Sequence, residues 1–386
     1  MIDIVIAHPA NDVALLRPAR SVSARRNGLA TALMALACTL FCAPGAWATD
    51  AARDELPTLP ELSNPYAAQA GEELPTPELT VQSPPAVLGD DLWLIDTRQP
   101  TPEHPEPCFK RCVRGTWQQE DVQSFVEASA DGLPVCVWIH GYQIPAGAAE
   151  AIGLDVYQHL RQLAPPEQKF RFVIWSWPSV KNGPYRIDAR RKARRSDIEG
   201  YKLARVIRAL PPEVPVGLLG FSFGSRLTGA TLHFLGGGSI AGLCLGPDSA
   251  CQPREVRAVL LAGALDNDAF ATGKLNGCAL GEGVCALVLT DRRDPVLFAY
   301  RHLEELSGAV AMGHSGPICV ACPDRVSTWD VTSWVRVSHD WRRYIHSERI
   351  LAPVAAMVLV VGAAPAERGS EELHAAAMLD SAISTQ

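Results

Sequence analysis

The chain has 386 residues, of which 47% are hydrophobic and 20% charged, which suffices for one large globular core or two ordinary ones. Its formal net charge of −7 argues against nucleic acid as a general partner, because phosphate binding depends on clustered positive charge. The sequence has no phosphate-cradling loop, dinucleotide fingerprint or H-E-x-x-H motif, so we expect neither a cofactor nor a catalytic metal.

The first 48 residues are predicted to be a signal peptide. A basic lead containing Arg25 and Arg26 precedes a Leu/Ala-rich run at 29–41, and Ala46-Trp47-Ala48 forms a small-x-small cleavage site. We therefore expect an exported protein, periplasmic or extracellular. A permanent anchor is the alternative, but the apolar run is too short for a stable membrane span. Residues 49–88 are rich in Pro, Glu and Ala and predict a poorly ordered arm.

Cysteine usage agrees with export, since an oxidising compartment favours disulfides. Of eleven cysteines, Cys38 and Cys42 fall in the signal peptide, and Cys136 lies in an apolar strand as a buried thiol. The other eight form four close pairs, for which local disulfides are the working prediction: Cys108 with Cys112, Cys244 with Cys251, Cys278 with Cys285, and Cys319 with Cys322. The last pair, a C-x-x-C, has a redox or zinc-binding role as its alternative.

A single folded domain is predicted over residues 89–348. Its first strand lies near 92–95, and the segment 97–118 holds four prolines, too many for a helix or an inner strand. Uninterrupted apolar strands then alternate with helices, as in a sheet covered on both faces. Strands are expected at 135–139, 170–175, 216–219, 256–261 and 285–289, and helices at 148–163 and from a capping box at 196–199 to Leu210.

This alternation predicts the α/β class, with a mostly parallel central sheet and helices on both faces. Residues 349–386 form a C-terminal extension. Its apolar part, 350–364, is short for a membrane span and is expected to dock on the domain as a helix or strand.

The domain is organised around Gly220-Phe221-Ser222-Phe223-Gly224, which joins an apolar strand to a helix. In that context G-x-S-x-G is typical of a strained turn that exposes a nucleophilic hydroxyl, here Ser222. Gly220 and Gly224 are needed because strand and helix approach too closely for a Cβ. The alternative is a chance match in a glycine-rich chain.

A serine nucleophile needs a base that a third group orients, in the order Ser, acid, His. Asp291 and Asp294 both follow the strand at 285–289; Asp294 is favoured because its Asp-Pro pair lies in the loop proper. His339, between a strand-like segment and a helical one, is the favoured base, and His314 remains possible.

The oxyanion of an acyl intermediate needs two N–H donors. The backbone N–H of Phe223 is one candidate, and that of Tyr142 is the other, because Gly141 lets the loop after an early strand turn under the substrate. His140 is interpreted as a structural residue that holds this loop. A basic stretch at 186–195 is interpreted as a solvated helix lead-in, with selection of anionic substrates as the alternative.

His140-Gly141, the elbow, Asp294 and His339, in this order, resemble the α/β-hydrolase superfamily. The closer resemblance is to a group of uncharacterised bacterial hydrolase-like proteins that share the Trp175-Ser176-Trp177-Pro178 strand end. The likeness covers about residues 90–348, and the segment 97–118 departs from it.

The resemblance implies an α/β-hydrolase fold that cleaves an ester, thioester or amide of a small-molecule or acylated substrate through an acyl-enzyme on Ser222. A non-catalytic binding protein on the same fold, or an acyltransferase with the same triad, is the alternative. The sequence leaves the substrate and the oligomeric state open.

Overall fold

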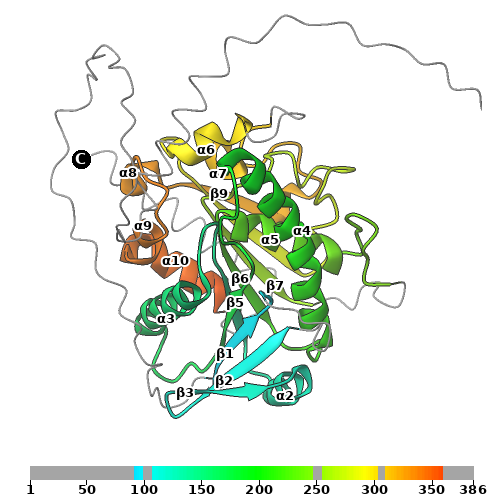
Figure 1. The fold of residues 1–386 in the computed structure, drawn as a ribbon, viewed down its shortest axis with the longest axis vertical. Coiled ribbons are helices and arrows are strands. Elements are labelled where there is room, and N and C mark those ends of the chain that lie inside the picture. Colours follow the sequence, from blue (N-terminus) through cyan, green and yellow to red (C-terminus); the bar gives the residue numbers. More distant parts are fainter. Residues whose placement is uncertain (1–90, 99–106, 247–253, 303–308, 360–386) are drawn as a thin grey trace, which may run out of the picture.

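The computed structural model describes residues 91–98, 107–246, 254–302 and 309–359, and nine strands of this part form one mixed sheet (Figure 1). The strand order is β3-β2-β1-β5-β4-β6-β7-β8-β9, with β1 and β4 to β9 parallel and β2 and β3 antiparallel. The strands are β1 Asp91–Asp96, β2 Cys108–Val113, β3 Thr116–Glu120, β4 Val135–Ile139, β5 Arg171–Ser176, β6 Val216–Phe221, β7 Val256–Leu261, β8 Val284–Thr290 and β9 Val326–Asp330. The α/β class and the mostly parallel sheet are thus confirmed.

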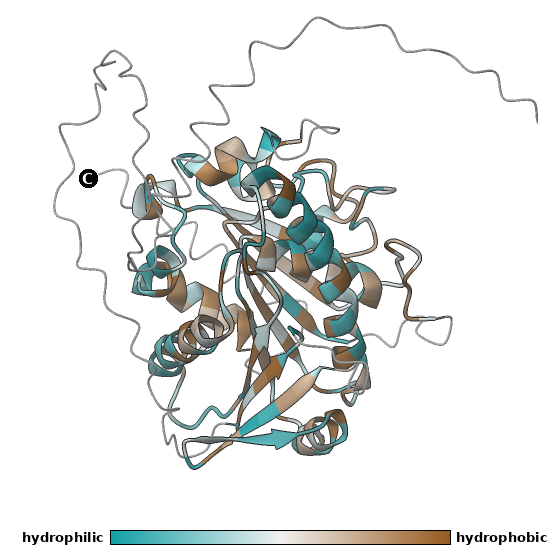
Figure 2. Ribbon diagram, viewed as in Figure 1, coloured by the Kyte–Doolittle hydropathy of each residue, from teal (hydrophilic) through white to brown (hydrophobic). Residues whose placement is uncertain are grey.

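Helices cover both faces of this sheet. In Figure 1, α5 and α4 lie on one side, while α3 and α10 lie on the other. The helices are α2 Val122–Ala128, α3 Ala146–Leu163, α4 Tyr185–Ala209, α5 Phe223–Leu235, α6 Pro295–Ala299, α7 Met312–Ser315, α8 Thr332–Val335, α9 Arg342–Ile345 and α10 Glu348–Val358. Every residue of β4, β5 and β6 is buried, as expected for strands sandwiched between helices, and Figure 2 shows these strands more hydrophobic than the outer helix α4.

The proline-containing segment 97–118 differs from the expectation in part. Its C-terminal portion forms β2, which pairs with β3 as an antiparallel hairpin at the edge of the sheet. The hairpin turn at Arg114 and Gly115 has positive φ angles of 51° and 78°, as a two-residue hairpin loop requires. The prolines at 100, 102 and 105 lie outside the described residues, so the prediction failed only where the chain was free of proline.

The capping box predicted at 196–199 is wrong. These residues lie in the middle of α4, which begins eleven positions earlier at Tyr185. Ser196 donates its hydroxyl to the Ala193 carbonyl at 2.7 Å, and the Glu199 carboxylate is paired with Arg195 at 2.7 Å. The basic stretch 186–195 therefore belongs to the helix itself, whose charged face is turned to solvent and coloured teal in Figure 2.

A glycine allows α4 to lie close against α5. A Cβ on Gly200 would stand 2.6 Å from Ala230 Cβ and 3.0 Å from the Leu227 carbonyl oxygen, closer than packed atoms tolerate. The Gly200 carbonyl also accepts the Thr231 hydroxyl at 3.3 Å. Because α4 covers α5 so closely, twelve of the thirteen residues of α5 are buried.

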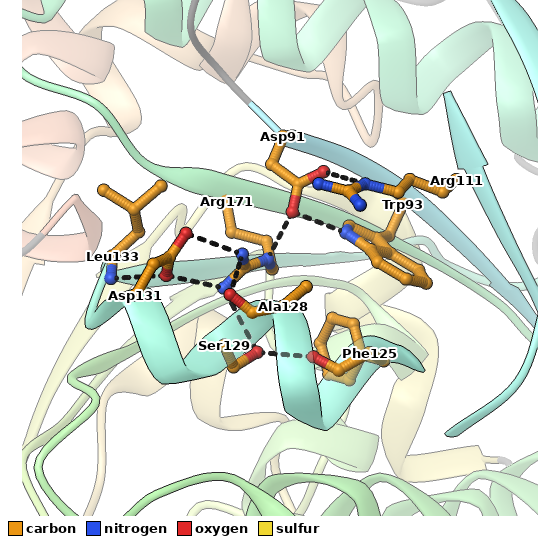
Figure 3. A network of polar contacts seen from close by, with 9 residues as sticks. All are labelled: Asp91, Trp93, Arg111, Phe125, Ala128, Ser129, Asp131, Leu133 and Arg171. Atoms are coloured by element: carbon orange, nitrogen blue, oxygen red, sulfur yellow. Dashed lines mark hydrogen bonds and ion pairs between the residues drawn. The ribbon is translucent and has the colours of Figure 1, made fainter. Parts of the chain in front are cut away.

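A buried arginine fastens the amino-terminal end of the sheet. Figure 3 shows the Arg171 guanidinium between the carboxylates of Asp91, at 2.7 Å, and Asp131, at 3.1 Å, with the Ala128 carbonyl at 2.8 Å. Asp91 also accepts from Arg111 at 2.7 Å. This ion-pair network connects β5, β1, β2 and the turn that leads into β4.

All eight described cysteines are free thiols, so the structure forms none of the local disulfides predicted among them. Cys108 and Cys112 lie four positions apart on β2, about 13 Å along an extended strand, whereas a disulfide needs Cα atoms within about 7 Å. Cys136 is buried, as predicted, and burial raises the pKa of its thiol. Cys251, the expected partner of Cys244, lies outside the described residues.

The expected docking of the C-terminal apolar segment is observed for its first half. Helix α10 packs on β6, where a Cβ on Gly217 would stand 1.8 Å from the Val358 carbonyl oxygen. The predicted signal peptide, the arm at 49–88 and the extension beyond residue 359 lie outside the described residues. Within the part of the chain that is described, no helix has the length and apolar character needed to cross a membrane.

Candidate active site

Four of the predicted site segments meet at the carboxyl edge of the sheet. Tyr142 follows β4, Ser222 follows β6, Asp294 follows β8, and His339 follows β9 after the short helix α8. Parallel strands deliver their carboxyl ends to one edge, which is why residues far apart in sequence converge there. Strand β4 lies between β5 and β6, so chain order reverses at this point, next to the strand that leads to Ser222.

Ser222 occupies a strained turn between β6 and α5. Its φ of 55° and ψ of −117° are rare for any residue with a Cβ, at a cost of about 1–3 kcal/mol. Backbone hydrogen bonds on both sides hold the turn: Ser222 N–H donates to the Leu261 carbonyl at 2.9 Å, and the Ser222 carbonyl accepts from Ser225 N–H at 3.0 Å. This conformation turns the hydroxyl toward His339, whose Nε2 lies 2.9 Å from Ser222 Oγ.

The two flanking glycines are sterically required, as the sequence predicted. A Cβ on Gly224 would stand 2.0 Å from the Ile139 carbonyl oxygen, and one on Gly220 would stand 2.6 Å from the Gly224 carbonyl oxygen. Strand β4, strand β6 and the start of α5 therefore meet here without room for a methyl group.

The hydroxyl, imidazole and carboxylate form a continuous hydrogen-bonded chain. His339 Nε2 lies 2.9 Å from Ser222 Oγ, and His339 Nδ1 lies 2.6 Å from Asp294 Oδ2. Because a carboxylate only accepts, Nδ1 carries the proton, which leaves the Nε2 lone pair to accept from the serine hydroxyl. All three side chains are buried, and the Phe221 ring packs against the imidazole at a centroid distance of 5.1 Å. The arrangement can draw the serine proton onto His339.

Asp294 is fixed by its second carboxylate oxygen. Oδ1 accepts from the backbone N–H groups of Val296 at 2.9 Å and Leu297 at 3.0 Å, so Asp294 is the N-cap of α6. Such a cap fixes the side-chain rotamer and places the carboxylate at the positive end of the helix. Asp294 thus caps α6 and orients the imidazole of His339.

The alternative acid and base point elsewhere. Asp291 accepts from Arg293 N–H at 2.8 Å, and burial raises the pKa of its carboxyl to about 6. His314 bonds to the Asp291 backbone and its ring contacts Phe298 at 5.9 Å, while burial lowers its pKa. The structure therefore places His339, rather than His314, in hydrogen-bonding contact with Ser222, and Asp294, rather than Asp291, in contact with that imidazole.

The loop after β4 packs directly on the serine. A Cβ on Gly141 would lie 3.2 Å from Ser222 Cβ, so the glycine permits close approach of the Gly141–Tyr142 backbone. Phe223 begins α5, and its N–H belongs to the first turn, which has no intrahelical acceptor. The Tyr142 ring contacts the Phe223 ring at 5.8 Å, which places both predicted oxyanion donors on adjoining segments.

His140 acts within this loop as the sequence suggested. Its Nδ1 lies 2.9 Å from the Gly141 carbonyl, and its Nε2 lies 2.9 Å from an Arg98 guanidinium nitrogen. Arginine only donates, so Nε2 is the acceptor and Nδ1–H bonds the carbonyl. Burial and the neighbouring Arg98 charge lower the pKa of His140 to about 3. The ring is therefore neutral and stacks on Trp177 with an interplanar angle of 10°.

Three residues that the sequence did not single out also hold the loop. Arg98, just after β1, additionally donates to the Ser176 hydroxyl at 2.7 Å and to the Ile144 carbonyl at 2.9 Å. Asp188, near the start of α4, accepts the Tyr142 hydroxyl at 2.6 Å. Ser179 accepts from Gln143 N–H at 2.9 Å through its carbonyl. Arg98 follows a strand end, which is the one sequence feature that could have marked it.

In the described part of the chain, no cluster of potential metal ligands includes a residue of this site. The chain matches no protein-family model and no curated protein. Its function must therefore be inferred from the arrangement of Ser222, His339 and Asp294 and of the loop that packs on them.

Proposed function

We propose that the protein is a serine hydrolase of the α/β-hydrolase fold that cleaves an ester, thioester or amide through an acyl-enzyme. The observation that carries the proposal is the hydrogen-bonded chain from Ser222 through His339 to Asp294, with distances of 2.9 and 2.6 Å. A hydroxyl, a base and a buried orienting carboxylate at these distances are the functional unit of serine hydrolases.

The topology supports the proposed fold. The serine stands on a turn with φ of 55° between a central parallel strand and a helix, and acid and base follow later strands. The antiparallel hairpin of β2 and β3 occupies the edge of the sheet, away from these strand ends.

In the acylation step, Ser222 Oγ attacks the substrate carbonyl carbon while His339 Nε2 accepts the hydroxyl proton. The N–H groups of Phe223 and Tyr142 would donate to the oxyanion, and Asp294 stabilises the imidazolium that forms. His339 then gives its proton to the leaving alcohol, thiol or amine, which departs as the carbonyl reforms on Ser222.

Deacylation reverses these roles with water as the nucleophile. His339 removes a proton from water, the hydroxide attacks the acyl-enzyme, and the proton returns to Ser222 Oγ as the acid product leaves. An acyltransferase would differ only in the acceptor that replaces water.

Two exposed apolar side chains close in sequence to the catalytic residues favour an acylated substrate with an apolar part. Val337, two positions before His339, is 57% exposed, and Phe298, four positions after Asp294, is 54% exposed. Large exposed apolar side chains next to catalytic segments are typical of surfaces that bind apolar ligands.

The test is labelling with a fluorophosphonate probe, which phosphonylates an activated serine. We expect stoichiometric labelling of the wild-type protein and none of Ser222→Ala. The matched control is Ser239→Ala, which changes an exposed serine in the loop after α5 and should label normally. Wild-type protein that resists the probe, or a Ser222→Ala variant that reacts, would overturn the proposal. Labelled protein is then assayed on acyl esters of increasing chain length.

A further inference from the structure

Outside the proposed active site, two histidines and an aspartate converge between α3 and the segment that follows α9. Asp155 and His159 lie one helical turn apart on α3, and His346 is the C-cap of α9, 191 positions from Asp155. One potential ligand atom of each side chain lies within 4.8 Å of the other two. We propose that this Asp155–His159–His346 cluster binds a divalent transition-metal ion, zinc being the best match.

The distances suit a tetrahedral ion. His346 Nε2 lies 2.7 Å from Asp155 Oδ2, and His159 Nδ1 lies 3.7 Å from Asp155 Oδ1. Two ligand atoms on a tetrahedral zinc, each about 2.0–2.2 Å from the metal, are about 3.3–3.5 Å apart. The observed separations bracket this value, so shifts of under about 1 Å would bring these atoms to it.

The three side chains have the freedom to make these shifts. Each is between 28% and 38% exposed, so none is locked by packing. The imidazoles of His159 and His346 stack at a centroid distance of 4.3 Å with an angle of 12°, and they must tilt open to direct a lone pair at a common ion. The exposed side of the cluster leaves a fourth position for water.

The donor set selects the ion. Two imidazoles and one carboxylate favour zinc, copper or nickel over magnesium or calcium, which prefer oxygen ligands alone. In the metal-free cluster His159 Nδ1 also lies 2.9 Å from the Asp155 backbone carbonyl. This hydrogen bond must open when Nδ1 gives its lone pair to the ion.

The position of the cluster gives the ion a structural role. The Trp341 ring contacts the His346 ring at 5.6 Å on one side and the Trp138 ring of β4 at 6.5 Å on the other. The segment from His339 to His346 is thereby held at one end by Ser222 and Asp294 and at the other by α3, which lies beside α10 in Figure 1. A bound ion would fasten the base-bearing segment to α3; this consequence, but not metal binding itself, rests on the proposed function.

Metal binding is measured directly with metal-free protein whose thiols have been alkylated, so that the free cysteines do not compete. Isothermal titration with zinc should give one site per chain in the wild-type protein. His159→Asn and His346→Asn should each weaken binding by at least about 100-fold, beyond the roughly 10–100-fold that loss of an outer-shell partner costs. His302→Asn, the same change at a histidine outside the cluster, should bind zinc as the wild type does.

A second readout is independent of activity. Zinc should raise the melting temperature of the wild-type and His302→Asn proteins and leave those of His159→Asn and His346→Asn unchanged, because an ion stabilises only a protein that binds it. Copper should quench part of the tryptophan fluorescence, through Trp341 beside His346, in the same two proteins only. Zinc binding that is absent from the wild type, or undiminished in the double variant His159→Asn/His346→Asn, would show that the cluster is an ion pair without metal. Failure of fluorophosphonate labelling would leave these results standing.

Discussion

At the scale of single residues, Ser222 combines a strained backbone conformation with a full set of hydrogen bonds. Ser222 adopts a left-handed backbone conformation that costs energy, yet its N–H and carbonyl are both hydrogen-bonded and its hydroxyl meets His339. The glycines at 220 and 224 have no comparable chemistry and are required by the close approach of three backbone segments. Gly220 and Gly224 therefore make the motif a steric requirement of the fold, and Ser222 makes it a reactive turn.

The choice of acid can be tested with two matched substitutions. In Asp294→Asn the amide can donate to His339 Nδ1, which favours the wrong tautomer, so we expect the labelling rate to fall by about 10⁴-fold, as in serine proteases with this change. Asp291→Asn should label within a few-fold of the wild type, because Asp291 bonds Arg293 N–H rather than the imidazole. Pseudo-first-order rates with the fluorophosphonate measure both. The reverse ranking would make Asp291 the acid.

At the scale of elements, the α4–α5 contact depends on one small residue. Gly200→Ala would force a methyl group to 2.6 Å from Ala230 Cβ and 3.0 Å from the Leu227 carbonyl oxygen. Neither atom is the end of a flexible side chain, so α5 itself would have to shift. We expect the free energy of unfolding to fall by about 1–3 kcal/mol, the usual cost of overpacking. Denaturant unfolding measures this difference.

Gly147→Ala is the control for the preceding change, since it also replaces a helical glycine. An added Cβ there has nothing within 4 Å, so the alanine should stabilise α3 by about 0.5–1 kcal/mol. Equal effects of the two substitutions would mean that the α4–α5 contact relaxes freely.

The ion pairs at the amino-terminal end of the sheet provide a second comparison. Arg171 and Arg111 both contact Asp91 at 2.7 Å, but the Arg171 side chain is 1% exposed and that of Arg111 is 41% exposed. Arg171→Met removes the buried guanidinium and leaves Asp91 with the solvated Arg111 as its ion-pair partner, so it should cost about 3–5 kcal/mol. Arg111→Met should cost about 0–1 kcal/mol, as for solvated pairs. Equilibrium unfolding of the two variants distinguishes these values, and similar losses would mean that burial does not decide the strength of the pair.

Sequence patterns predicted the strands and helices that have a regular apolar pattern. They failed where the same residue spacing fits two structures, and where a strand is polar. Ser196 and Glu199 have the spacing of a helix start, yet the helix begins at Tyr185, because proline at 184 with the residues after it provides the actual boundary. Strand β2 and the edge strand β3 are mostly polar and partly exposed, so no apolar run marked them. Hydrophobic periodicity cannot separate such polar strands from loops.

At the scale of the whole molecule, the site follows from chain order once the sheet is parallel. Ser222, Asp294 and His339 each follow a strand end, which sequence reasoning could use to bring them together. The residues that hold the loop of Tyr142, such as Arg98 and Asp188, could not be found in this way. Their role depends on which strands are neighbours and on where α4 begins, and neither is encoded in a local pattern.

The molecule also carries two buried groups near the site whose effects on stability oppose each other between about pH 4 and 6. His140, with a pKa lowered to about 3, stays neutral when folded while the unfolded chain takes up a proton below about pH 6.5, so its contribution to stability is lost as pH falls. Asp291, with a pKa raised to about 6, keeps its proton when folded while the unfolded chain releases one above about pH 4, so its effect lowers stability as pH rises. In the wild type these two slopes partly cancel.

Asp291→Asn removes one slope and leaves the other. The stability of this variant should therefore rise more steeply with pH than that of the wild type, and the difference in unfolding free energy between the two should grow by up to about 3 kcal/mol from pH 4 to 7. Contributions of other titrating groups are shared by both proteins and cancel in the difference. Asp121→Asn tests the sign, because the Ser124 N–H lowers the pKa of Asp121 and this carboxylate stabilises the folded state as pH rises. Denaturant titrations at several pH values measure both differences in unfolding free energy. If the difference between wild type and Asp291→Asn stays constant with pH, the Asp291 carboxyl titrates alike in the folded and the unfolded chain.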